Sequence, residues 1–389
     1  METFIKTALI FLHILCLNSL LIRRPFTSFK NFETSAVAFS AENFADKQFG
    51  RNLLDTFEKN TEASRQKSVK VLDKNSVLCI LESSIKMMLQ EPKILSINRP
   101  IRADGSKGSL SVCGDTHGQF LDLANIFHED IGGYPTADNP FIFNGDLVDR
   151  GRYSFEGVMC LLAIKLADPQ AVHILRGNHE TSRMYLRYGF KDEINEKYDQ
   201  EVMHKFEELF EALPVAAVLQ DEVFVVHGGI GPTAATCTID ELNTHVMNRK
   251  LSKVSGEVFE ELLWSGKVLL QSNILGYIYS ENYKYGHCED PDDEDSKFSE
   301  SPRGLGSLFG KDATKSFLKR NKLKLLIRSH EVRDGGYDIM HNGKCITVFS
   351  APNYCRVSRN KGAIVRFEGD GMKPSFIVFD AKHYPIENH

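Results

Sequence analysis

Short apolar runs recur along the middle of the chain, and each is broken by a glycine or a block of polar residues. The runs are rich in Val, Ile, Leu and Phe, so they predict buried strands rather than amphipathic helices. A glycine at the end of such a strand lets the backbone turn sharply, and the next side chain can then point into a shared cleft. The predicted strands are 109–113, 141–144, 171–176, 222–226 and 323–328.

Apolar residues at spacings of three and four predict helices between these strands. The clearest amphipathic segments are 120–127, 155–166 and 202–213. Strands that alternate with helices indicate an α/β fold. Three further apolar runs near the C-terminus are 346–349, 363–367 and 375–379. We expect them to be successive strands of a second, mostly antiparallel sheet.

The region before the first predicted strand is less regular. Residues 41–100 show helical spacing at 53–57 and 77–89, which predicts a helical lead-in that packs on the main domain. The main domain would then be 101–389, because it must contain every polar block described below. In this domain, a stretch around 266–302 carries an acidic cluster at 289–295. Such a cluster predicts a solvated loop, and an acidic docking surface is the alternative.

The first forty residues have a different character. Lys6 precedes an apolar run from 8 to 22, and Arg23 and Arg24 follow it. The run is short for a membrane span but suits the core of a signal peptide. We therefore expect residues 1–40 to be a targeting, signal-like or anchor segment that directs the protein to the secretory route, an organelle or a membrane. A surface-packed terminal helix in a cytoplasmic protein is the alternative. Membrane contact is expected only through this segment.

Composition narrows the class of protein. The 389-residue chain has a formal net charge of -5 and a pI near 6.2, which argues against a general nucleic-acid binder. Its eight cysteines include no CxxC pair, so neither a zinc ribbon nor a disulfide framework is indicated.

Five polar blocks rich in Asp, His and Asn follow the predicted strands. They read GDTHGQ at 114–119, GDLVDRG at 145–151, RGNHE at 176–180, HGG at 227–229 and RSHE at 328–331. These side chains supply the oxygen and nitrogen donors that suit Mn, Fe or Zn. One such block could be a turn or a helix cap. Five blocks in this order indicate a two-metal phosphoesterase.

The blocks resemble those of the phosphoprotein phosphatase family of metal-dependent serine/threonine phosphatases. The resemblance covers 74–385 and includes LLWS at 262–265, Arg303-Gly304 and SAPNYC at 350–355. It implies a calcineurin-like metallophosphoesterase fold, with two central β-sheets in a sandwich flanked by helices. The first two blocks look most like the type 5 members. Those carry N-terminal tetratricopeptide repeats, for which this sequence shows no pattern. If the repeats restrain activity in the type 5 members, we expect this restraint to be missing here.

The resemblance also implies a reaction and a metal centre. The chain would hydrolyse phosphoserine and phosphothreonine by direct attack of a hydroxide that bridges two divalent ions, Mn²⁺ or Fe/Zn. Asp146 would bridge the ions, which together lower the pKa of the shared water. The remaining metal ligands would be Asp115 and His117 for one ion and Asn178, His227 and His330 for the other.

Two further sets of residues carry expected roles. His179 would protonate the leaving oxygen, and Asp149 would orient it and stabilise the imidazolium. The residues expected to bind the substrate phosphate are Arg150, Arg303, Asn178 and Tyr354. Phosphoproteins are the expected partners, together with regulatory proteins, and nucleic acid is not.

The sequence departs from the family pattern at three places. Gly266-Lys267 follow LLWS where the family commonly has Asp-Pro, the residues before Arg303 diverge, and 356–359 read RVSR where the family is acidic or neutral. These departures leave substrate contacts open. A dinucleotide polyphosphate hydrolase shares the early blocks but not SAPNYC. A catalytically silent relative would be expected to lack a metal ligand, and every ligand position is filled.

Overall fold

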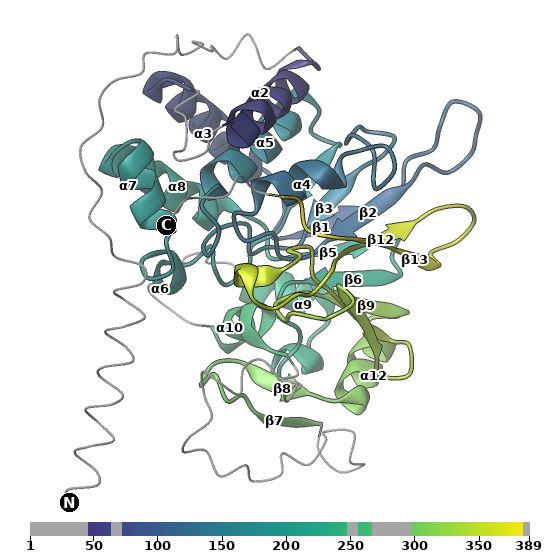
Figure 1. The fold of residues 1–389 in the computed structure, drawn as a ribbon. Coiled ribbons are helices and arrows are strands. Elements are labelled where there is room, and N and C mark those ends of the chain that lie inside the picture. Colours follow the sequence, from purple (N-terminus) through teal and green to yellow (C-terminus); the bar gives the residue numbers. More distant parts are fainter. Residues whose placement is uncertain (1–45, 64–71, 247–255, 267–296, 384–389) are drawn as a thin grey trace, which may run out of the picture. The chain divides into compact units, whose positions relative to one another are not determined.

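Two mixed β-sheets pack face to face, and helices cover their outer surfaces (Figure 1). This computed structural model describes residues 46–63, 72–246, 256–266 and 297–383. They all belong to one compact unit, Val37–His389. The predicted targeting segment 1–40 and the acidic cluster 289–295 lie outside the described residues. Among the described helices, none has the length and apolar character needed to cross a bilayer.

The first sheet has five strands. In spatial order they are β13 (Pro374–Phe379), β12 (Gly362–Phe367), β2 (Leu110–Cys113), β3 (Phe141–Phe143) and β4 (Val172–Ile174). β2, β3 and β4 run parallel, whereas β12 is antiparallel to both of its neighbours. The three parallel strands are buried along their whole length, as expected of strands covered on both faces.

The second sheet has six strands. In spatial order they are β1 (Ile94–Ile97), β5 (Ala216–Leu219), β6 (Val223–Val226), β9 (Leu325–Arg328), β11 (Cys345–Val348) and β10 (Tyr337–Met340). β6, β9 and β11 run parallel. A separate antiparallel pair is formed by β7 (Phe298–Glu300) and β8 (Ser307–Phe309).

Alternation along the strands builds three apolar layers. On β3, Ile142 points into the cluster between the two sheets, while Phe141 and Phe143 join the cluster under the helices. The helices on that outer side are α2 (Phe49–Ala63), α3 (Lys74–Met88), α4 (Phe120–Ile126), α5 (Ser154–Ala167), α7 (Phe190–Lys197) and α8 (Gln200–Ala212). Those on the six-stranded sheet are α9 (Ile239–His245), α10 (Glu257–Trp264) and α12 (Lys311–Arg320). The predicted α/β sandwich is confirmed.

The described part of the interval 41–100 is only partly helical. It holds α2 and α3 but ends in β1, which pairs in parallel with β5. Its helices also belong to the main core, because the Phe57 ring makes edge contacts with Phe120 and Phe155 at centroid distances of 6.1 and 6.2 Å. A boundary at residue 100 therefore falls inside the sandwich, between two of its strands.

The C-terminal strands are arranged differently from the prediction. They do not form one antiparallel sheet, because β11 joins the six-stranded sheet beside β9 while β12 and β13 complete the five-stranded sheet beside β2. The chain crosses between the sheets after Phe349, which forms an isolated bridge with Asp115. This crossing brings the ends of β2 and β11 together next to the first polar block.

Candidate metal centre and active site

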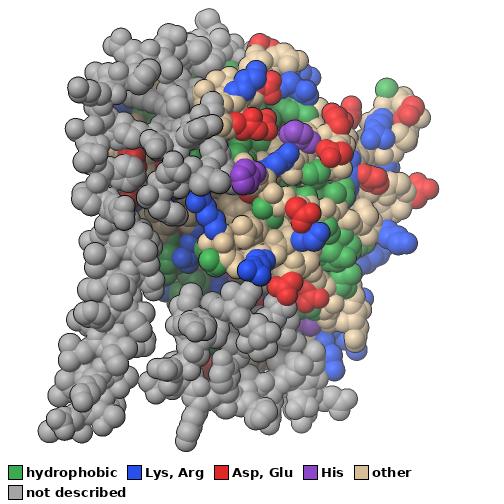
Figure 2. Space-filling view, viewed as in Figure 1, with side chains coloured by type: hydrophobic (Ala, Val, Ile, Leu, Met, Phe, Trp, Pro, Cys, Tyr) green, Lys and Arg blue, Asp and Glu red, His purple; other side chains and the backbone are tan. Residues whose placement is uncertain are grey.

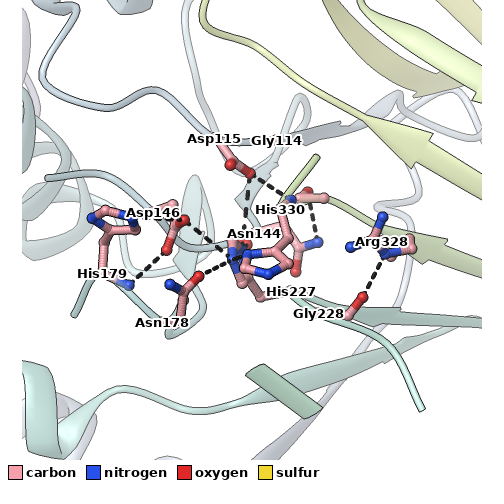
Figure 3. A network of polar contacts seen from close by, with 12 residues as sticks. Gly114, Asp115, Asn144, Asp146, Asn178, His179, His227, Gly228, Arg328 and His330 are labelled. Atoms are coloured by element: carbon pink, nitrogen blue, oxygen red, sulfur yellow. Dashed lines mark hydrogen bonds and ion pairs between the residues drawn. The ribbon is translucent and has the colours of Figure 1, made fainter. Parts of the chain in front are cut away.

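The predicted metal ligands lie on loops at the carboxyl ends of β2, β3, β4, β6 and β9. Figure 3 shows Asp146 lying between His179 on one side and His227 and His330 on the other. Strands from both sheets contribute, so the site sits across the sandwich. Short contacts link all six predicted ligands into one buried cluster, namely Asp115, His117, Asp146, Asn178, His227 and His330.

Two histidines present the same nitrogen to Asp146. Nδ1 of His117 lies 2.9 Å from the carbonyl oxygen of Val148, and Nδ1 of His227 lies 2.8 Å from that of Asn144. A carbonyl oxygen only accepts, so each Nδ1 carries a proton and each Nε2 is left to bind something else. Nε2 of His117 and of His227 lie 3.7 and 3.3 Å from Oδ2 of Asp146. Backbone carbonyls hold metal-ligating histidines in this way.

The second half of the cluster brings nitrogen and oxygen atoms together around one point. Asn178 Oδ1 and His330 Nδ1 lie 2.9 and 3.2 Å from His227 Nε2. Burial and the nearby Arg303 lower the pKa of His330 well below its usual value, so this ring is neutral. Burial also lowers the pKa of His227, but Asp146 outweighs it and raises the value to about 9. Imidazole nitrogens and an amide oxygen gathered in this way are the donor types that bind divalent metal ions once the rings give up a proton.

The donor set fits two divalent ions. Ligand atoms of His117, Asp146 and His179 lie within 4.8 Å of one another, and so do those of Asp146, His227 and His330. Asp146 belongs to both groups, as a bridging ligand must. Burial alone would raise its pKa, but His227, His179 and His117 hold the value well below the usual range. Asp115 reaches the first group from the side, with Oδ2 3.5 Å from His117 Nε2.

Several site residues adopt left-handed backbone conformations. The φ values are 43° for His117, 54° for Asp146, 72° for Asp149, 71° for Arg150 and 72° for His330. Such values are uncommon for residues other than glycine and cost about 1–3 kcal/mol each. They persist only where the surroundings hold them. Here the Asp146 carbonyl accepts hydrogen bonds from the backbone nitrogens of Thr116 and His117, both at 3.0 Å.

Glu180 also holds the backbone of the loop that carries Asp146. Its fully buried carboxylate accepts hydrogen bonds from the backbone nitrogens of Asp146, Leu147 and Gly177 at 2.9, 2.8 and 2.8 Å. Gly177 is needed for the close approach, because a Cβ there would lie 2.3 Å from Asp146 Oδ1. Sequence reasoning assigned Glu180 no role. Its only signal was its position beside His179 in the RGNHE block.

His179 and Asp149 form a close pair. Nδ1 of His179 lies 2.6 Å from Asp149 Oδ2, and the second carboxylate oxygen accepts from the backbone nitrogen of Phe190 at 3.0 Å. The backbone of His179 is held as well, since its N–H donates to Asp146 Oδ1 at 2.8 Å. Burial lowers the pKa of His179, although Asp146 and Asp149 act in the opposite direction. Nε2 of His179 lies 4.0 Å from Asp146 Oδ2.

The candidate phosphate-binding residues surround this cluster. Tyr354 places its ring 5.0 Å from the His117 ring, and burial keeps its pKa well above the usual value, so its hydroxyl remains a donor. Arg303 donates to Nε2 of His330. Arg150 is exposed at the rim, with its guanidinium 4.0 Å from the centre of the Tyr188 ring.

Fold and site together define a metallophosphoesterase. The model of the calcineurin-like phosphoesterase family matches residues 109–334, and the chain belongs to this family. It is 42% identical over 317 residues to serine/threonine-protein phosphatase T of Trypanosoma brucei brucei, covering 81% of this chain and 60% of that protein. It is 39% identical over 337 residues to serine/threonine-protein phosphatase 5 of Solanum lycopersicum, covering 87% of this chain and 53% of that one.

A solved structure agrees with these relatives. A protein serine/threonine phosphatase from Saccharomyces cerevisiae superposes with a TM-score of 0.67 at 31% identity, covering 81% of this chain and 92% of its own. The predicted resemblance to the type 5 phosphatases is thereby confirmed. The chain spans 60% and 53% of the lengths of the two curated relatives just described.

Proposed function

We propose that the protein is a metal-dependent serine/threonine protein phosphatase that acts on phosphoproteins. The observation that carries the proposal is the shared Asp146 carboxylate, which lies between His117 on one side and His227 and His330 on the other, and beside the His179–Asp149 pair. A two-metal centre next to a buried acid–base group is suited to hydrolysis of a phosphate monoester.

Each metal position has a defined set of ligands in this proposal. Asp115, His117 and Asp146 would hold one divalent ion, and the second would be held by Asp146, Asn178, His227 and His330. Two bound ions supply a water of lowered pKa and neutralise charge on the phosphoryl oxygens. Nitrogen and oxygen donors of this kind suit Mn²⁺, Fe or Zn.

The leaving oxygen of serine or threonine needs a proton, and His179 is placed to supply it. Asp149 occupies Nδ1, so Nε2 is the nitrogen that faces the substrate. The contact with Asp149 favours the imidazolium by a charge-assisted hydrogen bond. Asp149 therefore fixes the direction of proton transfer and also supports the protonated state.

The phosphoryl group would be bound by hydrogen-bond donors. Arg150 and Arg303 offer planar, permanently charged forks that match phosphate oxygens. The Tyr354 hydroxyl and the Asn178 amide nitrogen complete the set. Together they would neutralise and orient the oxygens that take no part in bond breaking.

The decisive experiment is hydrolysis by the full chain with Mn²⁺. A phosphoserine peptide, p-nitrophenyl phosphate and diadenosine tetraphosphate are offered in parallel, with Asp146→Asn as the inactive control. We expect release of phosphate from the peptide that depends on added metal. Turnover of diadenosine tetraphosphate without turnover of the peptide would contradict the proposal, as would equal activity in the control.

A further inference from the structure

Arg150 is held at the rim of the site by an aromatic ring. Its guanidinium carbon lies 4.0 Å from the centre of the Tyr188 ring, within the range of a cation–π contact. Among the described residues, no carboxylate forms an ion pair with this guanidinium. The ring thus occupies the place that an acidic partner would otherwise take.

The segment that carries Arg150 is fastened to the segment that carries Tyr188 at two more points. The backbone nitrogen of Arg150 donates to the Tyr188 carbonyl oxygen at 3.1 Å, and the backbone nitrogen of Phe190 donates to Asp149 at 3.0 Å. Both Asp149 and Arg150 have φ near 70°, so these contacts help to hold an unfavourable backbone. Phe190 is fully buried, which makes the support rigid.

Tyr188 also lies beside the proposed general acid. Its ring centroid is 5.6 Å from that of His179, yet the side chain remains 38% exposed. Tyrosine is often only partly buried, so it is the contacts of the ring with His179 and Arg150 that point to a role. The exposure of Tyr188 is explained if one face supports Arg150 at the entrance of the cleft.

We propose that Tyr188 is a positioning residue that pre-orients Arg150 for the phosphoryl group of the substrate, an inference that rests on the proposed function. A face-on ring holds the cation without neutralising it and without consuming its N–H donors. A carboxylate partner would neutralise the charge and would also occupy the N–H donors. The guanidinium edge is therefore left free for the phosphate oxygens, with less rotamer freedom to lose on binding.

The test compares Tyr188→Phe and Tyr188→Leu, each alone and combined with Arg150→Ala, in the Mn²⁺-loaded full chain. Phe keeps the aromatic face and should stay within about two-fold of wild type. Leu keeps the bulk but loses the ring, and should raise KM for a phosphoserine peptide about 3- to 30-fold, the range of a cation–π contact, with a smaller change in kcat. In the Arg150→Ala background, Leu should change KM less than about two-fold.

Binding of inorganic phosphate, measured by calorimetry, provides a readout that needs no turnover. Tyr188→Leu should weaken it by the same factor, and Tyr337→Leu, which removes a ring stacked on Phe376 at 3.9 Å, serves as the matched control. Equal losses with and without Arg150, or equal losses for Phe and Leu, would overturn the inference, as would undetectable phosphate binding by wild type. A chain that binds phosphate in a Tyr188-dependent way but cleaves no phosphopeptide would refute the proposed function alone.

Discussion

The carboxylate of Glu180 accepts a hydrogen bond from the backbone nitrogen of Asp146 at 2.9 Å. The Glu180 carboxylate thus fixes the backbone of Asp146, whose own carboxylate belongs to both groups of candidate metal ligands. Burial is the main reason that the pKa of Glu180 rises to about 7, and the nearby Asp146 adds to it. The three backbone donors held by Glu180 make it a support of the site that no side-chain pattern reveals.

Glu180→Gln tests this support. An amide has one oxygen in place of two, so at least one backbone N–H would lose its acceptor, which costs about 1–3 kcal/mol. We expect a loss of that size in the free energy of unfolding, together with weaker Mn²⁺ binding. Urea unfolding and metal titration check both. Glu196→Gln, an exposed exchange on α7, is the control, and equal behaviour of the two variants would refute the role.

Asp146→Asn tests the bridge. Removing one charge from the carboxylate shared by both groups should weaken both metal sites and abolish nearly all turnover. Elemental analysis after dialysis gives the metal content, with the exposed exchange Asp192→Asn as the control. An active variant that retains two tightly bound ions would show that Asp146 is not the bridge.

His179→Asn separates protonation from metal binding. We expect kcat on a phosphoserine peptide to fall by about 10²–10⁴-fold, the usual contribution of a general acid, with metal content unchanged. The loss should be smaller with p-nitrophenyl phosphate, because its leaving group hardly needs a proton. Losses of equal size on the two substrates would mean that His179 positions the substrate instead.

His173 predicts a pH dependence of stability away from the metal site. It is buried on β4, and burial, with a contribution from Lys165, lowers its pKa to about 3. The unfolded chain binds a proton there below about pH 6.5, whereas the folded chain does not. The contribution of neutral, buried His173 to the free energy of unfolding is therefore fully present above that pH and is lost as the pH falls.

The lowered pKa of His173 also sets how large this loss of stability should be. Between pH 7 and 5, wild type should lose about 1–2 kcal/mol more than His173→Gln in free energy of unfolding, measured with urea at each pH. His204→Gln, an exposed exchange on α8, should behave as wild type. Identical pH profiles for wild type and His173→Gln would rule out this contribution.

Arg356 and Arg359 lie on the loop that follows Tyr354, and both are exposed with left-handed backbones. Their charge should favour phosphopeptides with acidic flanks by several-fold at low salt, since exposed pairs contribute about 0.2–1 kcal/mol each. The measurement is kcat/KM on acidic-flanked and basic-flanked peptides for wild type and Arg356→Ala with Arg359→Ala. Lys319→Ala with Arg320→Ala is the matched control. An unchanged ratio would remove these arginines from substrate recognition.

The sequence allowed much of the site to be predicted because each ligand directly follows an apolar strand. The predicted strands 109–113, 141–144 and 222–226 match β2, β3 and β6 within a residue or so. β1 and β5 could not be recognised in the same way. Ile94–Ile97 and Ala216–Leu219 are short apolar runs that no glycine-rich polar block follows, and their pairing in the sheet, with each other and of β5 with β6, is what marks them as strands.

Contacts between distant parts of the chain account for the other differences. Nothing in the run 346–349 indicates that it lies beside β9 while the next two strands join β2. Non-glycine residues such as His330 and Arg150 give no local signal for a left-handed backbone. The supporting roles of Glu180 and Tyr188 likewise depend on loops that meet only in the folded chain.

The edge contacts of Phe57 have a practical consequence for any shortened form of this protein. Phe120 begins α4 immediately after the GDTHGQ block and is covered by Phe57 of α2. A chain trimmed to the first polar block would leave this face of the sandwich open to water and would lose β1 as well. Truncation from the N-terminus is thus expected to be tolerated only up to about Phe49, and a cut beyond it should yield aggregation instead of a minimal enzyme.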